Sequence, residues 1–331
     1  MNNKIIIIAE AGGNHNGSLK KAYKLVDIAK KAGADYVKFQ TFKAETLVSK
    51  NAPKAKYQKK NVKKISHYEL IKKLEMSYDM HVKIINYCKQ KKIKFLSSPF
   101  CIDSFNLLRK FNLDFIKIPS GEITNLPLLR HIRNFNNNII LSTGMSNVGE
   151  IKSALKILKN KNRKIILLHC NTEYPTPLDD INLNAMQTLK KQFKLDVGYS
   201  DHSLGIQVPI IAASLGAKVI EKHFTISKKM VGPDHVASLS PKELISMVKA
   251  IRSTETILGK GKKFVSKSEK KNILIARKSL FAAHDIKKGE KFSLVNLVCL
   301  RPGSGISPIN IDKVIGLKAK KTFLKGQLIK I

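Results

Sequence analysis

Two histidines, His202 and His223, each follow a short apolar run of the chain. If the two runs are neighbouring strands of one sheet, both imidazoles lie at the same edge and can share a divalent metal ion. Mn(II) or Mg(II) would suit such a site if substrate oxygens completed the coordination shell. Two ligands are fewer than most protein sites supply, so the spacing alone leaves two unrelated hydrogen-bonding histidines as an equal alternative.

Two lysines, Lys38 and Lys117, lie inside otherwise apolar runs. A buried ammonium group needs either a carboxylate partner or an anionic ligand, because an unpaired buried charge is costly. A Schiff-base nucleophile is the alternative role for a buried lysine. Ser98, Ser120 and Ser200 follow other runs of the same kind, and together with the lysines they favour a cradle for a phosphate or carboxylate group.

Glu10 ends the first apolar run and is the candidate for general acid–base chemistry. It could equally neutralise Lys38 in the next run. Asp234 and His235 follow the last of the runs, in a segment that could close over the others. These residue types predict a metal-assisted enzyme that acts on a phosphorylated or carboxylated small molecule.

The elements that would position these residues alternate regularly along the chain. Short, β-branched runs predict strands buried on both faces, and longer amphipathic segments between them predict helices. The predicted strands are 5–9, 36–39, 93–96, 115–118, 139–142, 165–169, 196–199 and 218–221. The predicted helices are 19–32, 81–90, 104–111, 127–134, 148–158, 184–192, 206–215 and 241–258. Eight such units predict a (β/α)8 TIM barrel, an α/β fold.

A polar cluster follows each of the eight predicted strands. In a barrel all these positions converge on the carboxyl-terminal rim, where this fold builds its active sites. One or two polar residues could be helix caps, but a cluster after every strand indicates an enzyme. The polar, Lys-rich segment 43–80 is expected to be an extended loop after the second strand.

The chain changes character after the predicted barrel. We expect a catalytic barrel over residues 1–262, a linker over 263–272 and a small β-rich domain over 273–331. About 60 residues form only a marginal core alone, so the small domain is expected to lean on another surface.

The composition limits the classes of protein. The formal net charge is +37, which at first suggests nucleic acid as a partner. However, only seven of the basic residues are arginines, and the lysines are scattered, so a lysine-rich codon bias explains the charge better and we expect no nucleic-acid partner. The four cysteines have no zinc spacing and no apolar stretch is long enough for a membrane span, which together favour a cytoplasmic protein.

The sequence resembles the sialic acid (N-acetylneuraminate) synthase family over nearly its whole length. The matching segments are 9–18 (AEAGGNHNGS), 37–41 (VKFQT), 117–122 (KIPSGE), 141–145 (LSTGM), 169–177 (HCNTEYPTP), 198–202 (GYSDH), 221–224 (EKHF) and 232–235 (GPDH). Residues 285–290 (DIKKGE) and 301–306 (RPGSGI) resemble the family's antifreeze-like (SAF) domain. Each motif alone is weak, but this many in order are specific.

The resemblance implies a transferase that condenses phosphoenolpyruvate with N-acetylmannosamine, releasing N-acetylneuraminate and phosphate. It implies a homodimer in which the SAF domain covers the partner's barrel. It assigns Glu10 to proton transfer and His202 and His223 to Mn(II) or Mg(II). Phosphoenolpyruvate would contact Lys38, Ser98, Lys117, Ser120, Thr172 and Ser200, and the acceptor sugar would contact Gln40, Tyr174, Asp234 and Arg301.

Other functions fit parts of the same pattern. Sister branches make legionaminate or pseudaminate from di-N-acetylated 6-deoxy hexoses. Segments 42–44, 171–177 and 232–235 favour the sialic and legionaminic branches, and between these we expect the sialic one. A metal-dependent aldolase or isomerase explains the histidines and lysines equally well, but not the motif at Arg301.

Overall fold

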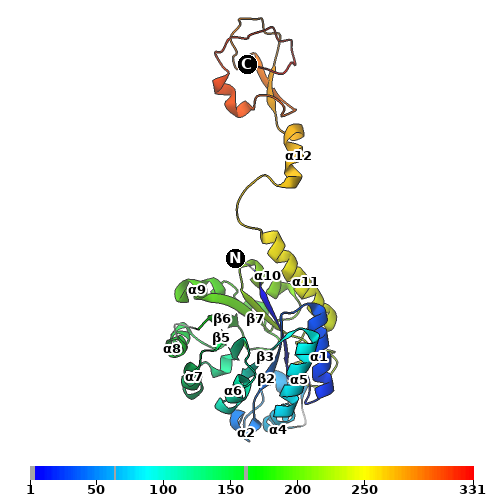
Figure 1. Ribbon diagram of the computed structural model, residues 1–331, viewed down its shortest axis with the longest axis vertical. Helices are drawn as coiled ribbons and strands as arrows, with labels where there is room; N and C mark the ends of the chain where they lie inside the picture. The colour runs from blue at the N-terminus through cyan, green and yellow to red at the C-terminus, as the bar shows by residue number, and fades with distance from the viewer. Residues whose placement is uncertain (1–3, 63–64, 160–162) are drawn as a thin grey trace. The chain divides into compact units, whose positions relative to one another are not determined.

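The computed structural model describes residues 4–62, 65–159 and 163–331. The chain forms two compact units, Met1–Gly259 and Lys260–Ile331 (Figure 1). The division lies close to the predicted end of the barrel.

Eight parallel strands form the centre of the first unit. They are β1 (Ile6–Gly12), β2 (Tyr36–Thr41), β3 (Lys94–Pro99), β4 (Phe115–Ile118), β5 (Asn138–Ser142), β6 (Ile165–Cys170), β7 (Asp196–Asp201) and β8 (Val219–His223). Their order is β3-β2-β1-β8-β7-β6-β5-β4, and the two end strands β3 and β4 contact each other. The predicted (β/α)8 barrel is therefore confirmed, with β7 and β8 as neighbours.

Helices surround this barrel on the outside (Figure 1). They are α1 (Leu19–Ala32), α5 (Tyr78–Lys91), α6 (Ile102–Arg109), α7 (Leu126–Arg133), α8 (Val148–Leu158), α9 (Ala185–Phe193), α10 (Gln207–Ser214) and α11 (Pro241–Leu258). Short 3-10 turns, η1 (Ser120–Glu122) and η2 (Leu178–Asp180), follow β4 and β6. Local sequence sets the helix ends: the Ser18 hydroxyl caps the start of α1, and Gly33 ends it in the left-handed conformation.

The period of two along each strand separates the two faces of the barrel wall. Ile8, Leu96, Ile140 and Leu168 belong to a cluster that fills the barrel interior. The next side chain on the same face lies two residues further along. In β1, Glu10 lies two residues after Ile8 and therefore faces the barrel interior as Ile8 does. The same spacing places the predicted site residues of the other strands on the inner face.

The segment after β2 differs from the expected extended loop. It contains three short helices, α2 (Ala44–Leu47), α3 (Lys56–Asn61) and α4 (His67–Lys73). Ser66 and Glu69 form a capping box that starts α4, a signal missed among the many lysines. Phe42, Leu70 and Leu74 form a buried apolar cluster, so this segment has a small core of its own.

The second unit has its own core around Leu280, Phe292 and Phe323. Its elements are α12 (Lys267–Ala276), the antiparallel pair β9 (Ser279–Ala282) and β10 (Leu297–Leu300), and the 3-10 helix η3 (Pro308–Lys313). Part of the predicted linker 263–272 is therefore helical. Ser266 and Glu269 form a capping box at the start of α12, which stabilises that end of the helix.

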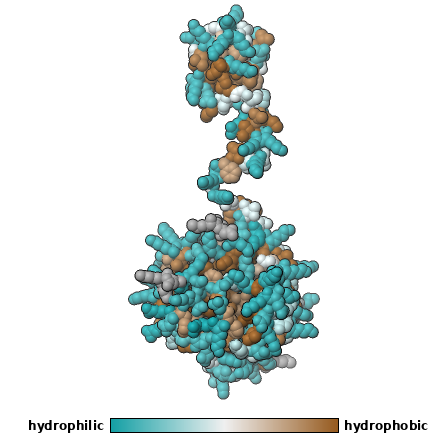
Figure 2. All heavy atoms as spheres, in the orientation of Figure 1, coloured by the Kyte–Doolittle hydropathy of each residue, from teal (hydrophilic) through white to brown (hydrophobic). Residues whose placement is uncertain are grey.

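Hydrophilic side chains are spread over the face of the barrel unit that Figure 2 shows, as expected for scattered lysines. None of the helices in the described part of the chain has the length and apolar character that crossing a bilayer requires.

Candidate active site

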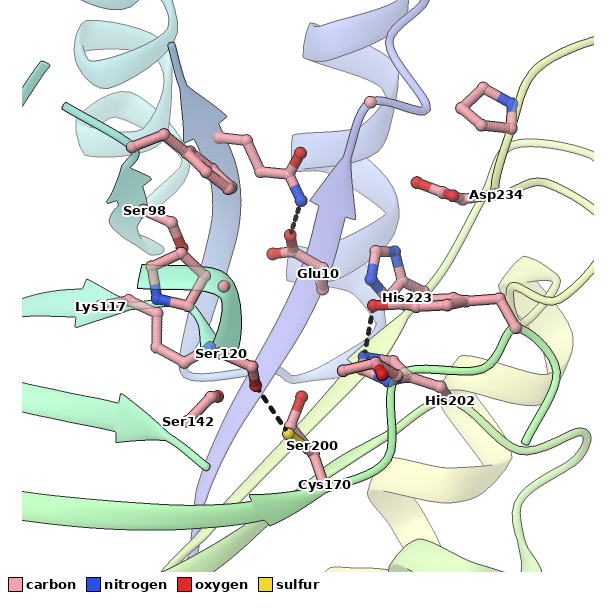
Figure 3. A pocket seen from close by; sticks show the side chains of 18 of the residues that line it. Glu10, Ser98, Lys117, Ser120, Ser142, Cys170, Ser200, His202, His223 and Asp234 are labelled. Atoms are coloured by element: carbon pink, nitrogen blue, oxygen red, sulfur yellow. Dashed lines mark hydrogen bonds between the residues drawn. The ribbon is translucent and has the colours of Figure 1, made fainter. Parts of the chain in front are cut away.

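A cavity of about 240 Å³ opens at the carboxyl ends of the barrel strands. Figure 3 shows side chains from strands far apart in the sequence pointing into it. All the site residues predicted in the barrel line this cavity: Glu10, Lys38, Gln40, Ser98, Lys117, Ser120, Thr172, Tyr174, Ser200, His202, His223 and Asp234. The structure thus brings them together, while their individual roles stay predictions.

The two buried lysines pair with two buried carboxylates, Glu10 and Glu221. Lys38 Nζ lies 2.8 Å from Glu10 Oε2 and 3.6 Å from Glu221 Oε2. Lys117 Nζ lies 2.9 Å from Glu221 Oε1. These four side chains, here called the lysine–carboxylate cluster, are all at most 5% exposed. A buried lysine was expected to meet either a carboxylate or an anionic ligand, and the structure has carboxylates at both positions.

Two of the predicted serines complete this cluster. Lys38 Nζ donates a hydrogen bond to Ser98 Oγ at 3.1 Å. Ser200 Oγ donates to Glu221 Oε1 at 2.9 Å. Each serine therefore satisfies a charged neighbour now and can turn its hydroxyl group to an anionic ligand when one binds.

Ser120 lies on the other side of the cluster, where the chain leaves β4. Its Oγ accepts a hydrogen bond from Gly144 N at 3.0 Å and lies 3.2 Å from Cys170 Sγ. A Cβ atom at Gly144 would lie 2.9 Å from Ser120 Oγ and 2.8 Å from Thr172 Cγ2. Only glycine leaves space for these two side chains beside the backbone.

The two carboxyl groups of the cluster have opposite pKa shifts. Burial raises the pKa of Glu10 to about 7, and Lys38 offsets this only in part. Burial acts in the same direction on Glu221, but Lys117 and Lys38 outweigh it and lower the pKa to about 2. Near neutral pH, Glu221 is therefore a fixed anion, whereas Glu10 can hold or release a proton.

His202 and His223 lie beside this cluster, with ring centroids 5.5 Å apart. His202 Nδ1 donates to the Asn171 carbonyl, so Nε2 carries the lone pair and accepts from the Tyr174 hydroxyl at 2.9 Å. Burial lowers the pKa of His202 to about 4, and burial with His202 as a neighbour lowers the pKa of His223 well below its ordinary value. Both imidazoles are thus neutral near pH 7.

Neutral imidazoles are the form that binds metal ions. His223 Nδ1 is a buried atom without a hydrogen-bond partner, and His202 is oriented by a backbone carbonyl, as metal-ligating histidines usually are. Among the described residues, no group of three or more His, Cys, Asp or Glu side chains is arranged to hold a metal. The residues fit a divalent ion whose remaining ligands come from substrate and water.

The predicted acceptor residues divide between the two units. Gln40 Nε2 donates to Glu10 Oε1 at 3.4 Å, Tyr174 stacks on His202, and burial raises the pKa of Asp234 to about 6. Arg301 belongs to the second unit, where its side chain is exposed and its Nε donates to Ala276 O at 3.0 Å. The role of Arg301 remains what the resemblance predicts.

Sequence reasoning gave no role to several residues of the cavity. Glu221 follows from the strand period, because it lies two residues before His223 on β8 and so faces the same way. Ser142 and Cys170 also line the cavity at the ends of β5 and β6. The apolar residues from the segment after β2 carried no sequence signal, because their placement depends on how that segment folds over the barrel.

Comparison with protein families gives two matches. Residues 25–263 match the model described as the NeuB family, and residues 277–331 match the SAF domain. Two curated proteins match nearly the whole chain. The N,N'-diacetyllegionaminic acid synthase of Campylobacter jejuni is 52% identical over 99% of both chains. The protein of the same name from Legionella pneumophila is 44% identical over 97% of this chain and 92% of that one.

A solved structure supports the same relationship. The sialic acid synthetase of Leptospira borgpetersenii is 35% identical and superposes with a TM-score of 0.73, covering 82% of this chain and 91% of that chain. The family match over residues 277–331 confirms the predicted SAF domain at the end of the chain.

Proposed function

The chain belongs to the NeuB family of sialic-acid-type synthases, and from this premise we propose that it condenses phosphoenolpyruvate with 2,4-diacetamido-2,4,6-trideoxymannose. The products would be N,N'-diacetyllegionaminate and phosphate. The lysine–carboxylate cluster beside two neutral histidines in one cavity is the observation that carries this proposal, because it places positive charge that can attract an anion next to two imidazoles that could hold a metal ion.

The choice of acceptor differs from the expectation of N-acetylmannosamine. That expectation has support only at the level of the family. The two legionaminic acid synthases are 52% and 44% identical to this chain, whereas the sialic acid synthetase is 35% identical. The relatives thus favour the alternative acceptor, a 6-deoxy sugar with acetamido groups at C2 and C4.

Phosphoenolpyruvate carries a phosphate and a carboxylate, and the cavity has a matching charge. With Glu10 protonated, Lys38 and Lys117 are opposed by only one carboxylate, Glu221. The excess positive charge attracts the anion, and the hydroxyl groups of Ser98, Ser120, Thr172 and Ser200 can donate to its oxygens. This arrangement would hold C3 of phosphoenolpyruvate towards the acceptor aldehyde.

Glu10 would move the proton that the reaction needs at two stages. As C3 attacks the aldehyde carbon, protonated Glu10 gives its proton to the aldehyde oxygen, which becomes a hydroxyl group. The Glu10 carboxylate then takes a proton from the water that adds to C2. Phosphate leaves as the C–O bond of the tetrahedral intermediate breaks, and the C2 hydroxyl group gives its proton to the departing phosphate and becomes the ketone oxygen. A pKa of about 7 suits a group that acts first as acid and then as base.

His202 and His223 would hold Mn(II) or Mg(II). When bound, such an ion polarises a carbonyl oxygen as a Lewis acid. The two imidazoles themselves orient the aldehyde end of the acceptor towards the lysine–carboxylate cluster. Gln40, Tyr174 and Asp234 would position the rest of the sugar from the same rim.

The resemblance also supports proposals about the assembly and its location. We propose a homodimer in which Arg301 of one chain reaches the acceptor bound in the partner's barrel. The four cysteines are free, as is usual in a reducing compartment, and a cytoplasmic enzyme would meet phosphoenolpyruvate there.

Phosphate release from phosphoenolpyruvate tests the proposal. With Mn(II) present, we expect the full-length protein to use 2,4-diacetamido-2,4,6-trideoxymannose at a higher kcat/KM than N-acetylmannosamine. Removal of divalent ions with a chelator should stop turnover, and Mn(II) should restore it in the wild type but not in His202→Ala. Preference for N-acetylmannosamine would place the chain in the sialic branch. No release with either sugar would favour an aldolase-type enzyme instead.

A further inference from the structure

One side of the active-site cavity is apolar, in contrast to the charged cluster at its base. Five side chains form this side: Phe42, Leu47, Ile71, Leu74 and Phe100. They are here called the apolar wall. The first four come from the segment between β2 and α5, and Phe100 follows β3. Gln58 of the same segment also lines the cavity, and its Oε1 accepts a hydrogen bond from Ala55 N at 3.0 Å.

The apolar wall is built into the small core of that segment. Phe42 and Leu74 are buried, at 5% and 6% exposure, while the other three are half-buried against them. The rings of Phe42 and Phe100 meet edge to face with centroids 5.8 Å apart. Such a supported wall keeps its shape when a ligand binds.

Two contacts fix the wall over the barrel rim. A Cβ atom added to Gly13, in the loop after β1, would lie 3.0 Å from Leu74 Cδ1, so Leu74 packs directly on that loop. Asn61 Nδ2 donates to Pro233 O at 2.7 Å, which ties α3 to the loop that carries Asp234. The wall therefore faces the same cavity as the candidate catalytic groups.

The position of the wall indicates which part of the acceptor it contacts. The aldehyde carbon of the sugar must lie at the base, near the histidines and the lysine–carboxylate cluster, so the opposite end of its carbon chain points to the rim. At that end a 6-deoxy sugar carries a methyl group, whereas N-acetylmannosamine carries a hydroxymethyl group. A hydroxyl group against apolar side chains would lose its hydrogen bonds to water.

On the basis of the proposed function, we infer that the apolar wall selects the acceptor at C6. It receives the C6 methyl group of a 6-deoxy hexose and disfavours a C6 hydroxyl group. An apolar pocket discriminates against one added hydroxyl group only moderately, so the expected preference in kcat/KM is roughly 10- to 100-fold.

Two acceptors that differ only at C6 test this inference: N-acetylmannosamine and 2-acetamido-2,6-dideoxymannose. The measured quantity is the kcat/KM for the 6-deoxy sugar divided by the kcat/KM for N-acetylmannosamine. Both values are obtained from phosphate release with full-length protein, phosphoenolpyruvate and Mn(II). The wild type should prefer the 6-deoxy sugar. Ile71→Thr should lower the ratio by roughly fourfold or more, the factor that corresponds to one buried methylene group.

The chain offers matched controls from the same small core. Ile65 is half-buried in the cluster as Ile71 is, and it does not line the cavity, so Ile65→Thr should leave the ratio unchanged. Leu74→Thr, which also changes the apolar wall, should reduce the preference for the 6-deoxy sugar as Ile71→Thr does. Leu70→Thr is its control, because Leu70 is about equally buried and lies off the cavity. Equal changes within either pair would mean a general loss of packing and would overturn the inference.

The remaining outcomes separate the inference from the proposed function. A wild-type ratio near one, with good turnover of the diacetamido sugar, would overturn the inference and leave the proposed function intact. A preference for the C6 hydroxyl group would overturn the inference and also weaken the choice of a 6-deoxy acceptor. No phosphate release with any acceptor would overturn both.

Discussion

Glu10 and Glu221 have the same side chain in the same cavity, yet their pKa values lie on opposite sides of the ordinary value. Glu221 contacts both lysines and the Ser200 hydroxyl, so its charge is stabilised. Glu10 contacts Lys38 and only weakly Gln40, and the charge of Glu221 nearby opposes its ionisation. The number of partners at each carboxylate thus separates a structural anion from a group that can move a proton.

This difference predicts proton uptake when phosphoenolpyruvate binds. The anion would raise the pKa of Glu10 further above about 7, because like charges oppose ionisation. At about pH 8, where free Glu10 is mainly ionised, binding should take up a proton; at about pH 6, where Glu10 already holds one, uptake should vanish. Calorimetry in buffers of different ionisation enthalpy measures this uptake.

Glu10→Gln is the matched variant for that experiment, since the amide keeps the shape and cannot titrate. It should bind phosphoenolpyruvate without the uptake at about pH 8, and its turnover should fall by roughly 10²- to 10⁴-fold. Uptake of the same size in the variant would assign the proton to another group.

For single residues, the sequence predicted which side chains line the cavity better than it predicted which side chains pair with each other. An inward lysine in an apolar strand needs a carboxylate or an anionic ligand, and the structure shows the first of these two alternatives at Lys38 and Lys117. The identity of Glu221 as the shared partner depends on how β2, β4 and β8 are placed around the barrel, which no local pattern encodes. The pKa shifts depend in turn on that geometry.

The ends of β7 and β8 show how neighbouring residues in one motif divide between two tasks. Ser200 and His202 face the cavity, whereas Asp201 between them faces outward and pairs with Lys222 across the two strands. Lys222 Nζ lies 2.5 Å from Asp201 Oδ2, and both side chains are almost fully buried. Asp201 Oδ1 also accepts from Ser203 N at 2.9 Å, which holds the backbone on both sides of His202.

Lys222→Met should therefore destabilise the barrel strongly. Removal of the ammonium group leaves a buried carboxylate without its partner, which typically costs about 3–5 kcal/mol. The free energy of unfolding, measured by chemical denaturation, gives the loss. Lys164→Met is the control, because Lys164, just before β6, pairs at the surface with Asp196 at the start of β7, and such a pair contributes at most about 1 kcal/mol. Similar losses in both variants would refute a special role for the buried pair.

At the scale of elements, the barrel was predictable and the segment after β2 was not. Buried strands carry their signal in continuous apolar runs such as 139–142, and the eight runs coincide with the eight strands. The short helices α2, α3 and α4 have few apolar residues each, and they fold because Phe42, Leu70 and Leu74 pack together. Since that packing is not local, the sequence could not reveal the apolar wall either.

In the whole molecule, the second unit has a core of its own and exposed apolar side chains that bear on how the chain assembles. Its core is small, with residues such as Leu280, Phe292 and Phe323 at the centre. Large apolar side chains remain exposed on it, among them Leu294, Val295 and Ile309 at 71%, 79% and 87%. Leu294 and Val295 are adjacent in the chain, and apolar side chains that lie together on a surface would suit the partner contact of the proposed homodimer.

Mixing two impaired variants tests whether the second unit serves the partner's active site. Glu10→Gln removes the proposed acid–base group of the barrel, and Arg301→Ala removes the proposed contact to the acceptor and should raise its KM without raising that of phosphoenolpyruvate. In a mixed dimer, the barrel with intact Glu10 would receive the intact Arg301 of its partner, and that site would be active.

After equal mixing and exchange of chains, about one quarter of all sites should be intact, because half of the dimers are mixed and each has one such site. Phosphate release at low acceptor concentration, compared with each variant alone, measures the recovery. If Arg301 instead served the barrel of its own chain, every site would lack one of the two groups and mixing would restore no activity.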